Sequence, residues 1–228
     1  MMSSHAARVC ISVPAARSVF ERGGDPEHVL MTGNPVRRSV IEGDRARGRE
    51  VLGVPEDATL LLVFGGSLGA QHLNERVASL KSELLTRENL YILHSTGADG
   101  FEDTERALAL TSDEMKRYRV QPYIDNMGDM LAAADLVLSR SGASSVAEIA
   151  ALAVPSVLVP YPHATADHQT TNARYLCADA DIDAPAFVEE LLHLVDDAAA
   201  RDAMRQAARG LAQDRAAALL ADAVEGLR

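Results

Sequence analysis

Short, continuously apolar segments alternate along the chain with longer amphipathic segments, and this alternation restricts the fold more than any other feature. Strands that are apolar throughout, each followed by a helix, are typical of a parallel sheet with helices on both faces. We therefore expect an α/β fold of the Rossmann-like type. The expected strands are 60–64, 90–93, 118–123, 135–138 and 156–160, and the expected helices are 70–85, 102–116, 127–133, 144–152 and 168–176, with two or three closing helices after residue 186.

The first 33 residues stand apart from this alternation. They hold two short apolar pieces, 9–13 and 29–31, which are joined by a turn at 23–26. Two strands and a short helix cannot bury a core of their own. We expect residues 1–33 to be the trailing piece of a preceding domain and residues 34–228 to form a separate C-terminal domain.

Composition limits the classes of partner. The 33 acidic and 22 basic residues give a net charge of −11, and aromatic residues make up only 4% with no Trp, so no nucleic acid is expected as a partner. The 2 cysteines exclude a disulfide scaffold and favour a reducing compartment. No apolar stretch reaches the roughly 18 residues of a membrane span. A soluble, cytoplasmic protein is the expectation.

Three loops follow expected strands and open expected helices, which is where open parallel sheets bind ligands. The loop 65–70 (GGSLGA) combines glycines, a helix N-terminus and the Ser67 hydroxyl, all of which suit a phosphate. A plain glycine-rich turn is an equal alternative for this loop. The loop 139–145 (SRSGASS) opens a second helix, and its small residues could also receive an anion.

Glu148 lies about one turn into that second helix, where its carboxylate could accept hydrogen bonds from sugar hydroxyls. A capping box with Ser144 or Ser145 is the favoured interpretation of Glu148 from the residues alone. In the third loop, Gln169 and Asn172 are three residues apart and so share one helix face. Neighbouring amides suit the vicinal hydroxyls of a sugar, and a solvated helix start is an equal alternative.

Other polar residues carry weaker signals. His163, Asp167 and His168 fit no zinc spacing, so no metal site is expected. Arg37 could meet a phosphate, although spacing alone makes it a surface residue. The alternating arginines at 45, 47 and 49 are most simply a solvated helix face, and five scattered histidines, among them His94, receive no role. The loops together predict a site for a diphosphate and a sugar.

The same loops, taken in order, resemble the MurG family of bacterial N-acetylglucosaminyltransferases, which convert lipid I to lipid II in peptidoglycan synthesis. The resemblance rests on the segments 32–37 (TGNPVR), 65–70 (GGSLGA), 123–127 (YIDNM), 134–137 (ADLV), 140–143 (RSGA) and 163–173, which ends HQTTNA. It implies the C-terminal, donor-binding half of a GT-B glycosyltransferase. The implied donor is UDP-N-acetylglucosamine, the acceptor is lipid I, the transfer is inverting, and neither a metal nor another cofactor is implied.

Carried over by position, the resemblance assigns residues to each part of the donor. Ser67 and the backbone at the start of the second helix would hold the diphosphate, the Ile124 backbone the uracil, and Glu148 the ribose. Gln169, with Asn172, would contact the sugar ring. Arg37 matches the family's donor-site arginine at the domain junction. The full set is Arg37, Ser67, Ile124, Ala143, Ser144, Ser145, Val146, Ala147, Glu148, Gln169 and Asn172.

The family's acceptor pocket and the histidine considered for its general base belong to an N-terminal domain of which only a trailing piece is expected here. We therefore expect no catalytic residue in this chain, and donor binding with little or no turnover of lipid I. After Leu176 the family continues through a Gly-Ala-Ala turn and a short strand, whereas residues 177–181 lead almost directly to Pro185, so one strand is expected to be missing. The family is peripheral on the inner face of the cytoplasmic membrane, but a net charge of −11 gives this chain no reason to bind anionic lipid.

Three alternatives stay open. The chain could be the donor-binding subunit of a two-chain UDP-sugar glycosyltransferase, with lipid I bound by a partner chain. It could be another GT-B member such as a nucleotide-sugar epimerase, which the lack of evident acid and base residues around the crevice disfavours. It could also be a non-catalytic remnant that binds nucleotide sugars.

Overall fold

A five-stranded parallel sheet forms the centre of the computed structural model, which describes residues 6–20, 28–65, 71–161, 168–176, 181–211 and 215–226. The strand order is β5-β4-β3-β6-β7. The strands are β3 (Thr59–Phe64), β4 (Leu90–Ser95), β5 (Tyr118–Gln121), β6 (Leu136–Arg140) and β7 (Ser156–Val159). The expected Rossmann-like arrangement is confirmed, and β3, at the centre, pairs with β4 on one side and β6 on the other.

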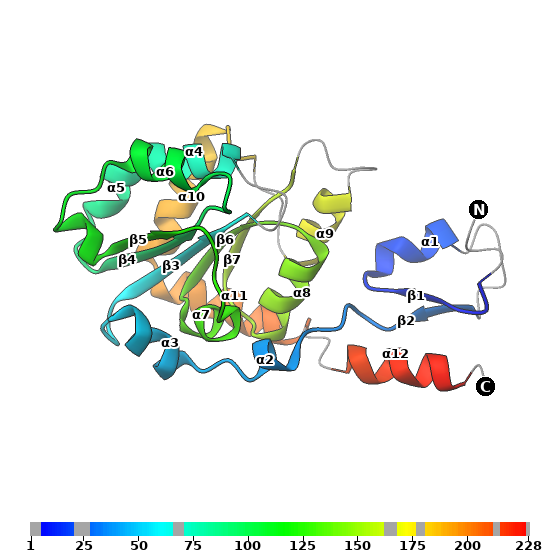
Figure 1. Cartoon of the computed structure of the whole chain (residues 1–228). Helices are drawn as coiled ribbons and strands as arrows, with labels where there is room; N and C mark the ends of the chain where they lie inside the picture. Colours follow the sequence, from blue (N-terminus) through cyan, green and yellow to red (C-terminus); the bar gives the residue numbers. More distant parts are fainter. Residues whose placement is uncertain are drawn as a thin grey trace.

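Helices cover both faces of this sheet (Figure 1). One face carries α4 (Gln71–Ser79), α5 (Lys81–Leu85), α6 (Phe101–Leu108), α10 (Pro185–Asp196) and α11 (Ala198–Arg209); the other carries α2 (Arg38–Ile41), α3 (Arg45–Leu52), α7 (Met127–Ala133), α8 (Ala143–Ala151) and α9 (His168–Leu176). Leu61 of β3 belongs to the first core and Leu62 to the second, because successive side chains of a strand face opposite sides. Both faces are therefore apolar, and the strands appear in the sequence as continuous apolar runs.

Two expected helices are interrupted. The helix expected over 70–85 breaks at Leu80, which separates α4 from α5. The helix expected over 102–116 ends at Leu108, because Ala109 adopts the left-handed conformation with φ 42°. Thr111 and Glu114 then cap a new turn, Glu114–Lys116: the Thr111 N–H donates to Glu114 Oε2 at 2.7 Å, and the Glu114 N–H donates to Thr111 Oγ1 at 3.3 Å.

The first strands of the chain form a separate sheet. β1 (Val9–Ile11) and β2 (Val29–Met31) pair in parallel, with the turn Pro14–Ala16 and α1 (Arg17–Phe20) after β1; we call β1 and β2 the N-terminal strand pair. The last helix, α12 (Ala216–Glu225), lies on this side of the molecule in Figure 1, and it lines a hollow of about 450 Å³ together with Pro35. The first and last elements of the chain therefore lie away from the five-stranded sheet.

The arginines of α3 form only in part the solvated face that their spacing suggests, because the side chain of Arg47 is 58% exposed whereas that of Arg49 is buried. Arg49 is only 1% exposed, and its guanidinium donates to Asp135 Oδ2 at 3.1 Å and to main-chain carbonyls that include that of Ala58. Arg45 donates to Asp135 Oδ1 at 2.7 Å, and Arg47 pairs with Asp129. The interpretation was wrong for Arg49, because spacing along α3 does not show the partly buried carboxylate of Asp135, which precedes β6 and accepts from Arg49.

The described ranges contain no helix with the length and apolar character needed to cross a membrane. The segment 177–180, where a strand is expected to be missing, lies outside the described residues.

Candidate functional site

The start of α8 lies at the carboxyl end of β6 and carries no side-chain cap. Gly142 precedes the helix in an extended conformation, with φ −63° and ψ 144°, and the Val146 N–H donates to its carbonyl at 2.9 Å. Residues at the first positions of a helix have N–H groups without an acceptor in the helix. Ala143 and Ser144 are exposed here. An exposed helix N-terminus of this kind favours an anion through its N–H groups and partial positive charge.

Glu148 is the sixth residue of α8, and its position rules out the capping box. A capping box with Ser144 or Ser145 requires one of them to precede the helix, whereas Gly142 does so. The Glu148 side chain is 14% exposed, and its Oε1 accepts a hydrogen bond of 3.1 Å from Nη2 of Arg37. The structure therefore brings together two residues of the expected set that are 111 positions apart in sequence.

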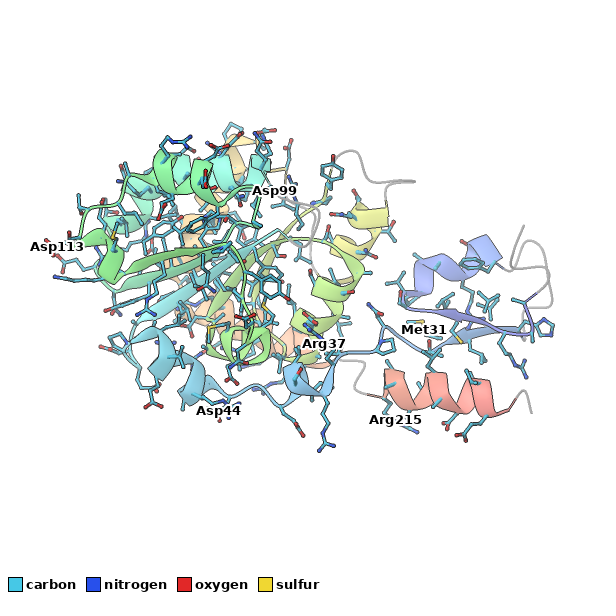
Figure 2. The ribbon with its side chains drawn as sticks, in the orientation of Figure 1. Met31, Arg37, Asp44, Asp99, Asp113 and Arg215 are labelled. Atoms are coloured by element: carbon cyan, nitrogen blue, oxygen red, sulfur yellow. The ribbon has the colours of Figure 1, made fainter. Side chains whose placement is uncertain are left out.

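Arg37 occupies the residue just before α2, where the chain arrives from the N-terminal strand pair (Figure 2). Its main chain is fixed, because its carbonyl accepts hydrogen bonds from the N–H groups of Val40 at 2.9 Å and Ile41 at 3.2 Å. Its side chain is 65% exposed. An anchored main chain and an exposed guanidinium let the charged group change partners without movement of α2.

The first turn of α9 is fastened to the loop in front of α8. The Ser141 hydroxyl donates to the carbonyl of Gln169 at 2.8 Å, and the Asn172 amide donates to the carbonyl of Ser141 at 3.1 Å. The Gln169 side chain reaches the end of β7, where its Oε1 accepts the Tyr161 N–H at 2.9 Å. Gln169 and Asn172 thus lie beside the α8 start, and Asn172 is buried in the contact with Ser141.

Ile124 lies in the loop 122–126 between β5 and α7. We call it the base loop, after the uracil base that the resemblance assigns to the Ile124 backbone. Its side chain is buried in the same core as Val146 of α8, so its position relative to α8 is fixed by packing. In the described part of the chain, no backbone hydrogen bond engages the N–H or the carbonyl of Ile124. Its neighbours Tyr123 and Asp125 are exposed. The backbone of this loop is therefore able to bond a ligand.

A buried carboxylate on α7 holds the base loop. Asp129 accepts hydrogen bonds of 2.6 Å from Nε and Nη2 of Arg47, one of 2.7 Å from the Asp44 N–H, and one from the Asn126 amide. The bonds from Arg47, followed by those from Asp44 and Asn126, outweigh the effect of burial and hold the pKa of Asp129 well below its usual range. Asn126 belongs to the base loop, so this cluster ties the loop to the start of α3.

The main chains of α7 and α2 also approach closely. A Cβ added to Gly128 would lie 2.3 Å from the carbonyl oxygen of Ser39, and one added to Gly43 would lie 2.2 Å from the carbonyl oxygen of Gly128. Neither contact leaves room for a side chain. The segment that begins at Arg37 is therefore seated directly against the helix that follows the base loop.

His94, which received no role from the sequence, is fully buried on β4. Its Nε2 lies 3.1 Å from Asn74 Oδ1, and its Nδ1 lies 3.1 Å from the Tyr118 hydroxyl. Because Asn74 Oδ1 can only accept, Nε2 carries the proton and Nδ1 accepts from Tyr118. Burial lowers the pKa of His94 to about 4, so the ring is neutral. A histidine inside an otherwise apolar strand was the signal in the sequence.

Arg140 ends β6 and is also buried. Its Nη1 donates to the Pro160 carbonyl at 3.0 Å, and its guanidinium carbon lies 5.8 Å from the centre of the Tyr161 ring. With Asn74 and Thr96, these two residues line a cavity of about 730 Å³ at the carboxyl ends of β4, β6 and β7. Burial lowers the pKa of Arg140 from its ordinary value.

One expected site residue, Ser67, lies outside the described residues, with the rest of 66–70. His163 and Asp167, for which no metal site was expected, also lie outside them, and the side chain of His168 is not described. The role of Ser67 stays a prediction. Across the ranges that the structure covers, no three His, Cys, Asp or Glu side chains cluster in a way that could hold a metal ion.

Comparisons with known proteins agree with this architecture. The profile of the glycosyltransferase family 28 C-terminal domain matches residues 60–221. The chain is 34% identical over 238 residues to the UDP-N-acetylglucosamine--N-acetylmuramyl-(pentapeptide) pyrophosphoryl-undecaprenol N-acetylglucosamine transferase of Desulforudis audaxviator, which covers 100% of this chain and 63% of the relative. A relative of the same name from Chlorobaculum parvum is 38% identical over 235 residues, 100% of this chain and 62% of its own. The chain spans about three fifths of the length of these relatives.

Solved structures of similar fold include a MurG enzyme. The crystal structure of Acinetobacter baumannii MurG aligns with a TM-score of 0.70 and 27% identity over 97% of this chain and 61% of its own. The UDP-N-acetylglucosamine 2-epimerase of Neisseria meningitidis aligns with a TM-score of 0.66 and 9% identity over 98% of this chain and 62% of its own, and at this identity it shows a shared fold alone. The resemblance to MurG that the loop motifs indicated is confirmed.

Proposed function

The chain belongs to glycosyltransferase family 28, and from this membership we propose that it binds UDP-N-acetylglucosamine as the donor half of a MurG-type N-acetylglucosaminyltransferase. The proposed reaction transfers N-acetylglucosamine to lipid I and gives lipid II in peptidoglycan synthesis. The observation that carries the proposal is the position of Glu148, which lies beside Arg37 and one turn beyond the uncapped start of α8.

The spacing along α8 suits a nucleoside diphosphate. The diphosphate would bind the free N–H groups of residues 143–145 at the start of the helix, together with the Ser67 hydroxyl. Val146 and Ala147 complete this first turn, and the Val146 N–H is already bonded to the Gly142 carbonyl. Glu148 follows Ser144 by four residues, which is about 6 Å along the helix axis. This separation matches the distance between the phosphate of a nucleotide and its ribose hydroxyls. The Glu148 carboxylate would accept hydrogen bonds from those hydroxyls. The uracil would then extend to the Ile124 backbone in the base loop.

The sugar would lie at the start of α9. We propose that the Gln169 side chain forms hydrogen bonds with the hydroxyls of N-acetylglucosamine. The amide of Asn172 is buried and bonded to the Ser141 carbonyl, so its proposed role is to hold the Ser141–Gly142 turn in front of α8 and thereby the sugar subsite.

In the proposed chemistry, the C4 hydroxyl of the acceptor's N-acetylmuramic acid attacks the anomeric carbon, the bond to UDP breaks, and configuration inverts. The start of α8 stabilises the charge that develops on the departing diphosphate. The attacking hydroxyl loses its proton to a general base that we place with the acceptor pocket, outside residues 34–228. Residues 1–33 would then be the trailing piece of the acceptor domain. Lipid I would be met at the inner face of the cytoplasmic membrane.

Calorimetric titration of the purified chain with UDP-N-acetylglucosamine, UDP and UDP-glucose tests the donor site. We expect saturable binding that favours the N-acetylated sugar and is weakened about tenfold or more by Glu148→Ala, because hydrogen bonds to a charged group are lost. Glu42→Ala is the matched control, since Glu42 forms an exposed ion pair with Arg38 away from the site. A folded wild-type chain that binds none of the three ligands contradicts the proposal.

A further inference from the structure

Two residues proposed for different parts of the donor bind each other. Glu148 is assigned to the ribose hydroxyls, and Arg37 is the expected donor-site residue whose guanidinium suits a phosphate, yet Arg37 Nη2 donates to Glu148 Oε1 at 3.1 Å. The carboxylate is 14% exposed and the guanidinium 65% exposed. A ribose diol that bonds to both carboxylate oxygens of Glu148 would therefore compete with the guanidinium for Oε1.

The guanidinium can leave Glu148 without rearrangement of the fold. The main chain of Arg37 is held by Val40 and Ile41 at the start of α2, and α2 is seated against Gly128 of α7. The long side chain is exposed, so it can rotate about its own bonds over the start of α8. Phosphate oxygens bound there would give it charge-assisted hydrogen bonds in place of the carboxylate.

We infer that Arg37 is a specificity-determining residue, which makes the site select nucleoside diphosphates over nucleosides by pairing with Glu148 until a diphosphate is present. The inference rests on the proposed function and adds to it a preference for nucleoside diphosphates over nucleosides. A nucleoside breaks the Arg37–Glu148 pair and gives the guanidinium no new partner. A nucleoside diphosphate breaks the same pair and supplies that partner, so only the second ligand recovers the lost interaction.

The test is a comparison of two ligands on three proteins. Uridine carries the ribose hydroxyls without phosphate, and UDP carries both; their Kd values are measured by ¹H–¹⁵N chemical-shift titration of the full chain, which reaches weak affinities. The variant is Arg37→Gln, and the matched control is Arg38→Gln. Arg38 is the neighbouring residue, it is paired with Glu42 instead of Glu148, and its loss changes the net charge equally.

With Arg37→Gln we expect uridine to bind about two- to fivefold more tightly, which is the size expected for release of one exposed ion pair. UDP is expected to bind about five- to tenfold more weakly, because charge-assisted bonds to phosphate are lost. Arg38→Gln should change neither Kd by more than about twofold. Raised salt should strengthen uridine binding to the wild type and leave Arg37→Gln unchanged.

Weaker binding of both ligands to Arg37→Gln overturns the inference, since Arg37 would then hold Glu148 in place for the ribose. Unchanged binding of both ligands also overturns it. In either case the wild type still binds UDP and UDP-N-acetylglucosamine, so the proposed function survives. A wild-type chain that binds no nucleotide at all is the separate result that removes the proposed function.

Discussion

Arg47 and Asp129 meet through two hydrogen bonds of 2.6 Å, from Nε to Oδ2 and from Nη2 to Oδ1, although 82 residues separate them in sequence. The Asp129 side chain is 2% exposed and the Arg47 side chain 58% exposed, so the carboxylate is the buried partner. Asp129 also receives the Asp44 N–H and the Asn126 amide. One carboxylate therefore joins α3, α7 and the base loop.

Replacement of Asp129 by Asn should lower the free energy of unfolding by about 1–3 kcal/mol, because an amide cannot accept at both positions and its own buried NH₂ group would face donors. Urea denaturation measures the change. The control is Asp113→Asn, which removes a side chain that is 91% exposed and paired with Lys116 three residues away. That control should change stability by less than about 0.5 kcal/mol, and equal losses in the two variants would contradict the prediction.

The contribution of Asp129 should disappear in acid. An aspartate in the unfolded chain titrates near pH 3.9, whereas the pKa of folded Asp129 lies well below that value, so the unfolded state takes up the proton first. The stabilisation is fully present above about pH 5 and declines as the pH falls through 3.9 towards the folded pKa. The gap between wild type and Asp129→Asn should therefore narrow below about pH 4. A gap that stays constant from neutral pH to about pH 3 would count against this account.

His94 should make the free energy of unfolding depend on pH in a higher pH range than Asp129 does. Its folded pKa of about 4 lies below the value of about 6.5 for an unfolded histidine, so stability is full above 6.5 and falls as the pH drops from 6.5 to 4. The difference corresponds to about 3 kcal/mol. His94→Gln should lose this dependence, whereas the exposed His193→Gln should retain the wild-type profile. Urea denaturation across this range measures it, and parallel profiles for His94→Gln and wild type would refute the assignment.

A methyl group at residue 128 should disrupt the contact between α7 and α2. The Cβ of Gly128→Ala would lie 2.3 Å from the Ser39 carbonyl oxygen, so one main chain must move, and we expect a loss of about 1–3 kcal/mol in unfolding free energy. Gly210→Ala is the control, because no atom outside its immediate chain neighbours lies closer than 3.7 Å to the added Cβ. Thermal denaturation of both variants decides the matter. A Tm for Gly128→Ala as high as that of Gly210→Ala would show that the close approach is not restrictive.

Asn172→Ala should affect both stability and donor binding. Loss of the bond to the Ser141 carbonyl should cost about 1–2 kcal/mol of unfolding free energy, and the loosened turn before α8 should weaken UDP-N-acetylglucosamine binding. Denaturation and calorimetry are carried out on the same preparation. Weaker donor binding at unchanged stability would mean instead that Asn172 contacts the sugar directly.

The sequence predicted the sheet because buried parallel strands hold continuous apolar runs, as β3, β4, β6 and β7 do, whereas the edge strand β5 alternates apolar and polar residues. It also placed Gln169 and Asn172 on one face of a helix, since helical spacing is local. It could not predict pairs that form only in three dimensions. Glu148 looked like a capping residue because nothing near it in sequence indicates Arg37, and Arg49 looked solvated because its partner Asp135 is 86 positions away.

The position of α12 means that the chain passes twice between the N-terminal strand pair and the five-stranded sheet. One passage is the segment 32–37, and the other lies between Arg209 of α11 and Ala216 of α12. Two covalent connections therefore join the two parts. Arg37 stands at the end of the first passage, so any change in the path of that passage would act directly on the residue that pairs with Glu148.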